Sequence, residues 1–178
     1  LNRRFGQLIN QLNHQPQTVV IVVEGAAMGG GFGLVCVGDV VLADQSAKFR
    51  LPETSLGLPP AQIAPFLVQR IGLAKSRRLA LTGARLSPKE AEDIGLVDYL
   101  YDNTESLEVG LAQILEQISN CAPVASATTK ALLLSSASKD LNALLDEGAK
   151  AFSDAARSAE GTEGMMAFMQ KRKPTWKS

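Results

Sequence analysis

The residues with the clearest capacity for chemistry stand together between positions 18 and 60. A β-branched run, Val19–Val23, is followed by a turn and by three consecutive glycines, Gly29, Gly30 and Gly31. This pattern predicts a strand that ends where a helix begins, on a backbone without Cβ atoms. A helix N-terminus presents unsatisfied N–H groups and a partial positive charge, and glycine lets a ligand approach them closely. The stretch therefore predicts a site for a negatively charged oxygen, either a bound anion or an oxygen whose charge develops during a reaction.

Two nucleotide-binding motifs do not fit this glycine run. In G-x-G-x-x-G, counted from Gly29 and Gly31, the third glycine would fall on Leu34. A P-loop ends in Gly-Lys-Ser/Thr, whereas Gly31 is followed by Phe32. The spacing alone leaves a structural alternative open, in which the glycines only permit tight packing of a helix on a sheet.

Glu53 is the second chemical candidate. It follows Pro52, whose fixed φ orients the backbone, in a predicted turn between a strand and Gly57. A single glutamate in a loop is usually solvated, so its position alone does not make it an acid/base group. The only histidine, His14, lies near a predicted helix end, and no cluster of Cys, His and carboxylate residues has the spacing of metal ligands.

The composition is that of an ordinary globular protein, with 46% hydrophobic residues, 20% charged residues and no net charge over 178 residues. This length predicts one domain with a substantial core. Zero net charge argues against a nucleic-acid or membrane-surface partner, and no apolar run approaches the roughly 18 residues of a membrane span. Cys36 and Cys121 are expected to be thiols in a reducing compartment, although a disulfide between them stays open. We expect a cytoplasmic protein, with an organelle matrix as the alternative.

Periodicity and punctuation predict the elements that hold these residues. Ser87, Pro88 and Glu90 have the pattern of a capping box with proline at the first helical position, and Gly95 that of the residue just past the helix end. Strands are expected at Val19–Val23, Val40–Leu42, Lys48–Leu51 and Leu96–Leu100, and helices at Leu1–Gln15, from Gly30, at Ala61–Arg70, Ala74–Thr82, Ser106–Asn120, Pro123–Ser136, Leu141–Ala156 and Thr162–Arg172.

Three segments in order resemble the crotonase (enoyl-CoA hydratase/isomerase) superfamily, and the resemblance covers nearly the whole chain. They are GAAMGGGFGLVCVGDVVLADQSAKF, LPETSLGLPP and IGLAKSRRLALTGARLSPKEAEDIGLVD. The resemblance implies an α/β fold: a superhelix of ββα turns over residues 1–103, followed by a helical trimerisation region over residues 104–178. Members of the family carry a further segment upstream, and the pattern beginning at Leu1 has no capping residue before it. We therefore expect the natural N-terminus to be missing.

The resemblance also implies roles for the glycines and for Glu53. The Gly30 N–H is expected to be one of two donors to the thioester oxygen of a coenzyme A substrate, with Gly29 and Gly31 lining the same site. The second donor is expected from the upstream segment. Glu53 is expected to move protons at C2, C3 or C4 of an enoyl thioester. The acyl group arrives as a coenzyme A thioester, so no permanently bound cofactor and no metal are expected.

Two positions depart from the two-glutamate hydratases of the family. Gly33 stands where those enzymes carry their other acid/base glutamate, and Ala61 replaces a glycine near their water position. The segment SLGLPPAQIAPF, together with Gly33, is most similar to the branch that acts on isohexenylglutaconyl-CoA and methylglutaconyl-CoA, in terpene and leucine catabolism. We also expect Gly33 to leave room for a substrate branched at C3.

The family counterpart of Lys171 reaches the coenzyme A of a neighbouring subunit, and Phe152 matches an aromatic residue near the same group. Both roles require an oligomer, expected as a homotrimer or a dimer of trimers. Three functions stay open: a hydratase for a branched enoyl-CoA, a Δ3,Δ2-enoyl-CoA isomerase, and a subunit that binds a coenzyme A thioester without turnover.

Overall fold

The computed structural model describes residues 2–177, which form two compact units. The first takes in the chain up to Asn13 together with Val19–Ala112, and the second His14–Thr18 together with the chain from Gln113 onward. Leu1, the first residue of the predicted N-terminal helix, lies outside the described residues. No helix between residues 2 and 177 combines the length and the apolar character that a membrane crossing needs.

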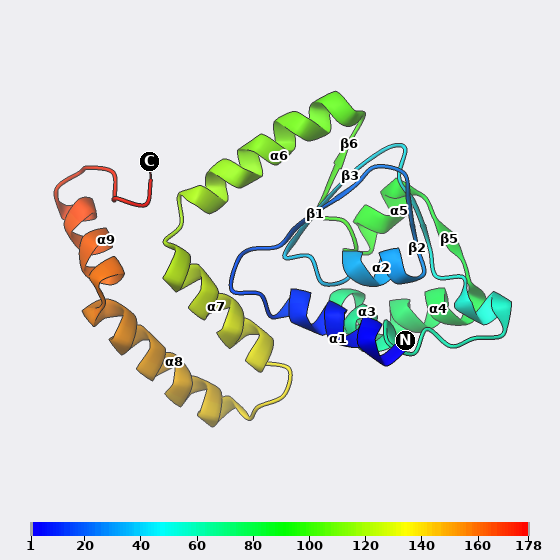
Figure 1. Ribbon diagram of the computed structural model, residues 1–178, viewed down its shortest axis with the longest axis horizontal. Helices are drawn as coiled ribbons and strands as arrows, with labels where there is room; N and C mark the ends of the chain where they lie inside the picture. The colour runs from blue at the N-terminus through cyan, green and yellow to red at the C-terminus, as the bar shows by residue number, and fades with distance from the viewer. Residues whose placement is uncertain (1, 178) are drawn as a thin grey trace. The chain divides into compact units, whose positions relative to one another are not determined.

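Two three-stranded sheets organise the first unit (Figure 1). One has the order β1-β3-β6 and is parallel throughout, and the other has the order β2-β4-β5, with β2 and β4 parallel and β5 antiparallel to β4. Successive stretches of chain thus add one strand to each sheet, as a superhelix of ββα turns requires. The strands are β1 (Val20–Val23), β2 (Ala26–Met28), β3 (Val40–Asp44), β4 (Lys48–Arg50), β5 (Arg85–Leu86) and β6 (Tyr99–Tyr101).

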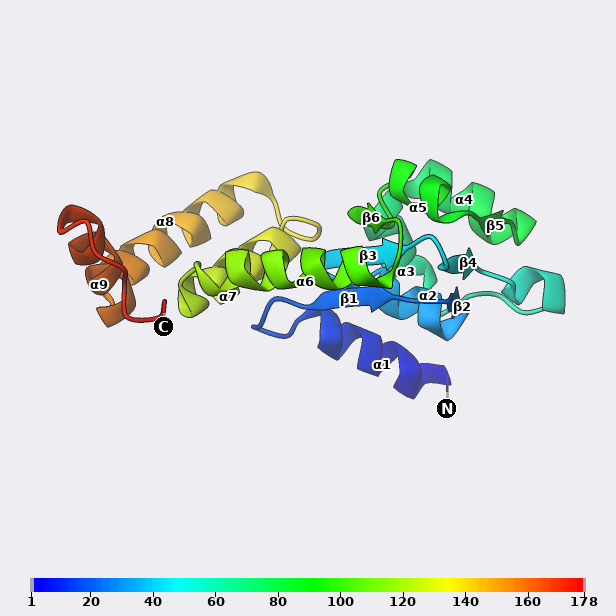
Figure 2. The same ribbon diagram turned by 90° about the horizontal axis from the view of Figure 1, so that it is seen from above.

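The middle strand β3 is the centre of the core, since Val41, Leu42 and Ala43 have no exposed surface. A strand in the middle of a parallel sheet is covered on both faces, which is why its sequence is a continuous apolar run. Helices lie beside the two sheets, as Figures 1 and 2 show. They are α1 (Asn2–Asn13), α2 (Gly30–Val35), α3 (Ala64–Ile71), α4 (Leu73–Thr82) and α5 (Pro88–Asp93), with a 3₁₀ turn, η1 (Glu53–Leu56), after β4.

The predicted helix caps are present. The Ser87 side chain accepts from the Glu90 N–H at the start of α5, the Glu90 carboxylate accepts from the Ser87 N–H at 2.8 Å, and Pro88 occupies the first helical position. Gly95 follows α5 with φ of 81°, as a residue past a helix end does. The strand expected from Leu96 is wrong in its first half: β6 begins only at Tyr99, because Leu96 and Val97 turn back to donate to the Ala91 carbonyl.

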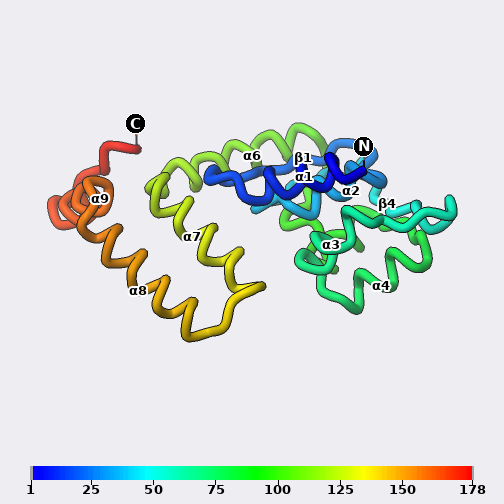
Figure 3. Tube along the Cα trace, turned by 60° about the horizontal axis from the view of Figure 1, so that its bottom comes forward, coloured from blue at the N-terminus to red at the C-terminus, as the bar shows by residue number. Residues whose placement is uncertain are grey.

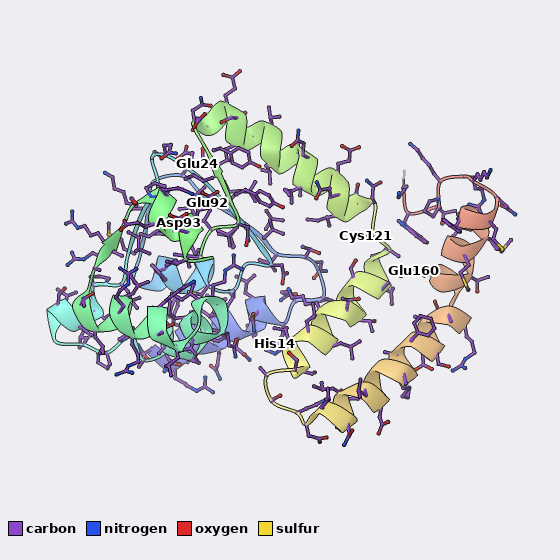
Figure 4. The ribbon with its side chains drawn as sticks, turned by 180° about the vertical axis from the view of Figure 1, so that it is seen from behind. His14, Glu24, Glu92, Asp93, Cys121 and Glu160 are labelled. Carbon is purple, nitrogen blue, oxygen red and sulfur yellow. The ribbon has the colours of Figure 1, made fainter. Side chains whose placement is uncertain are left out.

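The second unit is helical (Figure 3). Its helices are the end of α6 (Thr104–Ser119), then α7 (Pro123–Ser135), α8 (Leu141–Arg157) and α9 (Ala159–Met169). The helices α7 and α8 begin at the predicted residues, whereas α6 begins two residues and α9 three residues earlier than predicted. Glu160, labelled in Figure 4, accepts hydrogen bonds from the Val124 and Ala125 N–H groups at 3.0 and 2.9 Å, so that α9 caps the start of α7.

The division into a crotonase core over residues 1–103 and a helical region over residues 104–178 stays a prediction, and the compact units of the structure divide within α6. The first two turns of α6 pack with the first unit: Leu107 is 2% exposed, and the Thr104 hydroxyl donates to the buried Asp44 carboxylate at 3.1 Å. A helix that begins in one unit and ends in the other gives no change of composition at the boundary, so the sequence pattern does not mark it.

Candidate active site

The glycine run and Glu53 come together because they follow neighbouring strands. β2 and β4 are parallel, with Met28 opposite Arg50, so the residues after both strands leave the same edge of the sheet. The Gly29 N–H donates to the Arg50 carbonyl at 3.2 Å and ties the two chain segments at that edge. Ligands of α/β proteins gather beyond the carboxyl ends of parallel strands, and this edge therefore has the position of a functional site.

Hydrogen bonds fix the turn that carries Glu53. The Ser55 N–H and hydroxyl both donate to the Pro52 carbonyl, at 2.9 and 2.6 Å, and the Leu58 N–H donates to the Glu53 carbonyl at 3.0 Å. The Thr54 hydroxyl donates to the Ala80 carbonyl of α4 at 2.8 Å. Glu53 therefore stands on a turn that is closed on itself and anchored to a helix, rather than on a freely moving loop.

The Glu53 side chain faces the glycine run. A methyl group built on Gly29 would lie 3.2 Å from Glu53 Oε1, and the φ of Gly29, 52°, is one that residues with a Cβ rarely adopt. Glu53 Oε2 is buried and has no hydrogen-bond partner among the described residues. A buried oxygen without a partner costs free energy, and such groups in native proteins commonly have a functional explanation.

A cavity of about 440 Å³, here called the catalytic cavity, opens beside Glu53 and Gly30. Its other walls are mainly apolar, with few polar groups, which is the usual character of a small-molecule site. The lining residues are Asn2, Phe5, Gly30, Glu53, Leu58, Pro59, Pro60, Ala61, Gln62 and Ile63. Three residues singled out in the sequence, Gly30, Glu53 and Ala61, are therefore brought together in one cavity.

Gly30 is the first residue of α2, so its N–H has no carbonyl within the helix to which it can donate. The Phe5 ring lies directly over it: a methyl group on Gly30 would be 3.0 Å from Phe5 Cζ. Phe5 and Gly30 both line the catalytic cavity, so the ring forms an apolar wall beside Gly30. An oxygen bound at this amide would lie in a partly dehydrated site, where a hydrogen bond is stronger than in water.

The space expected at Gly33 is absent, and that expectation is corrected. Gly33 is buried, and a methyl group on it would lie 2.9 Å from Ile63 Cγ1 and 3.0 Å from Ile9 Cδ1. Two isoleucine side chains have filled the volume, so the missing side chain gives no room to a ligand. It also follows that a carboxylate at this position would need both isoleucines to move.

Gly31, Phe152 and Lys171 are not among the described residues that line the catalytic cavity. Gly31 is exposed, and a methyl group on it would meet nothing within 4 Å. Phe152 on α8 is 79% exposed and Lys171, which follows α9, has a positive φ of 52°; both belong to the second unit. Sequence reasoning missed Phe5 and Gln62 as cavity residues. Phe5 belongs to the helical apolar repeat that continues with Leu8, Ile9 and Leu12, and such a repeat does not distinguish a core residue from a residue in the wall of a cavity.

The cysteines are free thiols, so the disulfide left open by the sequence is not formed. Burial raises the pKa of the Cys36 thiol to about 12, which makes it a poor nucleophile. Between residues 2 and 177, no three His, Cys, Asp or Glu side chains are grouped so that they could hold a metal ion.

Comparison with known proteins shows the family and the fold of the chain. The family model described as enoyl-CoA hydratase/isomerase matches residues 1–178. A crystal structure of an enoyl-CoA hydratase/isomerase from Marinobacter aquaeolei is 51% identical, with a TM-score of 0.98 over 100% of this chain and 67% of its own. AtuE of Pseudomonas aeruginosa is 55% identical, with a TM-score of 0.97 over 99% of this chain and 69% of its own.

Among curated proteins, the chain is 33% identical to a probable enoyl-CoA hydratase of Bacillus subtilis, over 99% of this chain and 69% of the relative. The chain thus spans about two thirds of the length of the proteins that it matches. The fold is the α/β crotonase fold predicted from the sequence. With its glycine turn and Glu53 at one edge of a parallel strand pair, the chain belongs to the enoyl-CoA hydratase/isomerase family.

Proposed function

We propose that the protein hydrates an α,β-unsaturated acyl-CoA and that Glu53 is its only acid/base group. The observation that carries the proposal is the Glu53 carboxylate, whose Oε2 is buried without a partner in the described chain while Oε1 lies beside Gly29. A general base must be able to hydrogen-bond a water or substrate proton. Glu53 has an oxygen available for that bond, at the wall of a cavity that also exposes Gly30.

In the proposed reaction, the thioester oxygen accepts a hydrogen bond from the Gly30 N–H. Glu53 takes a proton from water as the water oxygen bonds to C3, and the electrons of the double bond move to the thioester oxygen as an enolate. The protonated Glu53 then delivers a proton to C2, which restores the carboxylate. One preorganised amide donor stabilises such an oxyanion by about 3–4 kcal/mol. The resemblance implies that a second donor completes the site from a segment outside this sequence.

An isomerase is the second candidate, and one observation favours it. Glu53 is the only carboxylate that lines the catalytic cavity in the described chain, and Ile63 and Ile9 occupy the position from which a second one would reach it. A single base can remove a proton from C4 and return it to C2 without a water molecule. Hydration by one carboxylate is possible but places two tasks on the same group.

For the substrate, we propose a β-branched acyl group of the glutaconyl type. Similarity of the segment SLGLPPAQIAPF to the methylglutaconyl-CoA and isohexenylglutaconyl-CoA branch supports it, and room at Gly33 no longer does. A homotrimer or dimer of trimers, with Lys171 and Phe152 near the coenzyme A of a neighbouring subunit, is part of the same proposal. The cytoplasmic location likewise stays a prediction.

Three thioesters distinguish the functions: 3-methylglutaconyl-CoA, crotonyl-CoA and a Δ3-enoyl-CoA. The protein, expressed from its complete reading frame, is incubated with each, and the products are identified by mass and by absorbance of the conjugated thioester. We expect a gain of one water on 3-methylglutaconyl-CoA at a higher kcat/KM than on crotonyl-CoA. A double-bond shift in the Δ3 substrate without water addition to either of the others would establish the isomerase instead. Binding of all three without change would leave only the non-catalytic subunit.

A further inference from the structure

Gln62 occupies the boundary between the catalytic cavity and a second, larger one. The second cavity, here called the polar cavity, measures about 740 Å³ and shares Ala61 and Gln62 with the first. It lies along α1, and its lining residues are Arg3, Arg4, Gly6, Gln7, Leu8, Asn10, Gln11, Ala61, Gln62, Pro65 and Phe66. The catalytic cavity and the polar cavity are therefore neighbours, with Ala61 and Gln62 in the wall that they share.

The fold makes room for Gln62 at the cost of a glycine inside a helix. Gly6 is buried in the middle of α1, and a methyl group on it would lie 2.9 Å from Gln62 Cδ and 3.3 Å from its Cβ, with Oε1 closer still. Glycine is unfavourable at such a position in a helix. Because Gly6 has no side chain, the half-buried carboxamide of Gln62 can pack against α1. Within residues 2–177 this carboxamide forms no hydrogen bond.

The charge of the polar cavity has one sign. Arg3 and Arg4 bring two guanidinium groups, and neither makes an ion pair or hydrogen bond within the described chain. The remaining polar side chains of the lining are carboxamides, and no described lining residue is acidic. A guanidinium and a carboxamide N–H both donate to an oxyanion, and Arg is suited to planar carboxylates.

We propose that Gln62 and the polar cavity bind a carboxylate carried at the far end of the substrate's acyl chain. The Gln62 carboxamide donates to the carboxylate where it leaves the catalytic cavity, and Arg3 and Arg4 supply the attracting charge beyond it. The inference rests on the proposed function, because it assumes that the thioester carbonyl lies at Gly30. It adds to that function the residue that selects acyl chains ending in a carboxylate.

The test uses two saturated thioesters, which bind without being hydrated: 3-methylglutaryl-CoA and 3-methylpentanoyl-CoA. They are identical except that the first ends in a carboxylate where the second ends in a methyl group. Dissociation constants are measured by calorimetry for the wild type and for Gln62→Leu. The control is Gln69→Leu, an exposed glutamine of α3 that lines neither cavity.

We expect the wild type to bind 3-methylglutaryl-CoA at least tenfold more tightly than the methyl analogue, as about one charge-assisted hydrogen bond would give. Gln62→Leu should bind 3-methylglutaryl-CoA about tenfold more weakly than the wild type and 3-methylpentanoyl-CoA with little change. Gln62→Glu should bind 3-methylglutaryl-CoA more weakly still, because its charge repels the carboxylate of the ligand. Thermal unfolding confirms that each variant is folded. Equal losses for both ligands, or none for either, would overturn the inference.

Coenzyme A itself carries phosphates, and a second arm separates that source of negative charge. Arg3→Gln/Arg4→Gln is measured with both ligands and with their 3′-dephospho forms. We expect the double variant to lose affinity for the ligand with an acyl carboxylate and not for its methyl analogue. The loss should be the same whether or not the 3′-phosphate is present. A loss that follows the 3′-phosphate whichever acyl group is present would overturn it. Because these are binding measurements, they test the inference even if no hydration is found. Hydration without acyl discrimination would overturn the inference and the glutaconyl-type substrate, and would leave the proposed hydration by Glu53 intact.

Discussion

Substitution of Gly30 by alanine tests the placement of the oxyanion donor with a small change. The added methyl group would lie 3.0 Å from Phe5 Cζ and 3.5 Å from Cε1 and Cε2. Carbon atoms in ordinary contact are about 3.5–4.0 Å apart, so either the ring or the start of α2 must move by a few tenths of an ångström.

The free energy of unfolding is expected to change little. Alanine is favoured over glycine in a helix by about 1 kcal/mol, and overpacking of this kind costs about 1–3 kcal/mol. The net destabilisation of Gly30→Ala is therefore about 0–2 kcal/mol. Catalysis should suffer more, because loss of a whole oxyanion donor costs about 10²–10³ in kcat; a displaced donor should cost about 10- to 100-fold.

The assay is steady-state hydration of 3-methylglutaconyl-CoA, with urea unfolding of the same samples. Gly31→Ala is the control for stability, because its methyl group meets nothing within 4 Å. In a Gly30→Ala/Phe5→Leu double variant the ring is gone, so kcat should recover to within a few-fold of Phe5→Leu alone, a coupling of at least about 1 kcal/mol. If Gly30→Ala keeps the wild-type kcat and KM, the Gly30 amide does not bind the reacting oxygen, and the reasoning fails.

Two further predictions concern buried positions. Gly33→Glu should destabilise the protein by about 3 kcal/mol or more, because the carboxylate would be buried against Ile63 and Ile9, and it should not provide a second acid/base group. Urea unfolding measures the loss of stability. A variant that is stable and more active than the wild type would contradict this prediction. Asp44 is 2% exposed, and hydrogen bonds from the Ser46 side chain and backbone hold its pKa below the usual value of 3.8. The stabilisation that the Asp44 carboxylate gives is therefore complete above pH 3.8 and is lost as the pH falls through its lower pKa in the folded protein. Asp44→Asn should be less stable than the wild type at pH 7, and its stability should decline less steeply in acid. Unfolding followed by circular dichroism at a series of pH values measures both.

Much of the site's framework was predictable because local rules set it. The β-branched run Val19–Val23 predicted the strand β1, and the Ser87 capping box fixed the start of α5. The unbroken apolar pattern of β1 is also typical of a strand covered on both faces, but only Val23 is buried because β1 lies at the edge of its sheet. The glycine run predicted the start of α2 at Gly30 for the same kind of reason, since a chain without Cβ atoms permits the turn at Gly29.

The missed features depend on partners far away in the sequence. Nothing near Gly33 indicates that Ile63 fills its space, and nothing near Phe5 places its ring over Gly30. The strands β2 and β5 are too short to show an alternating pattern, and they are recognised only because β4 pairs with both. The role of Gly6 likewise becomes visible only when the Gln62 side chain lies across it.

The measurement closest to the central claim is the kcat of Glu53→Gln, taken beside its affinity for 3-methylglutaryl-CoA. Glutamine keeps the shape of the side chain and removes the buried carboxylate whose Oε2 has no partner in the described chain. Loss of a general acid/base costs about 10²–10⁴ in rate, so we expect kcat to fall by at least about 100-fold while the folded protein still binds the saturated thioester. Turnover close to that of the wild type would show that another group moves the proton, and the assignment of Glu53 would be wrong.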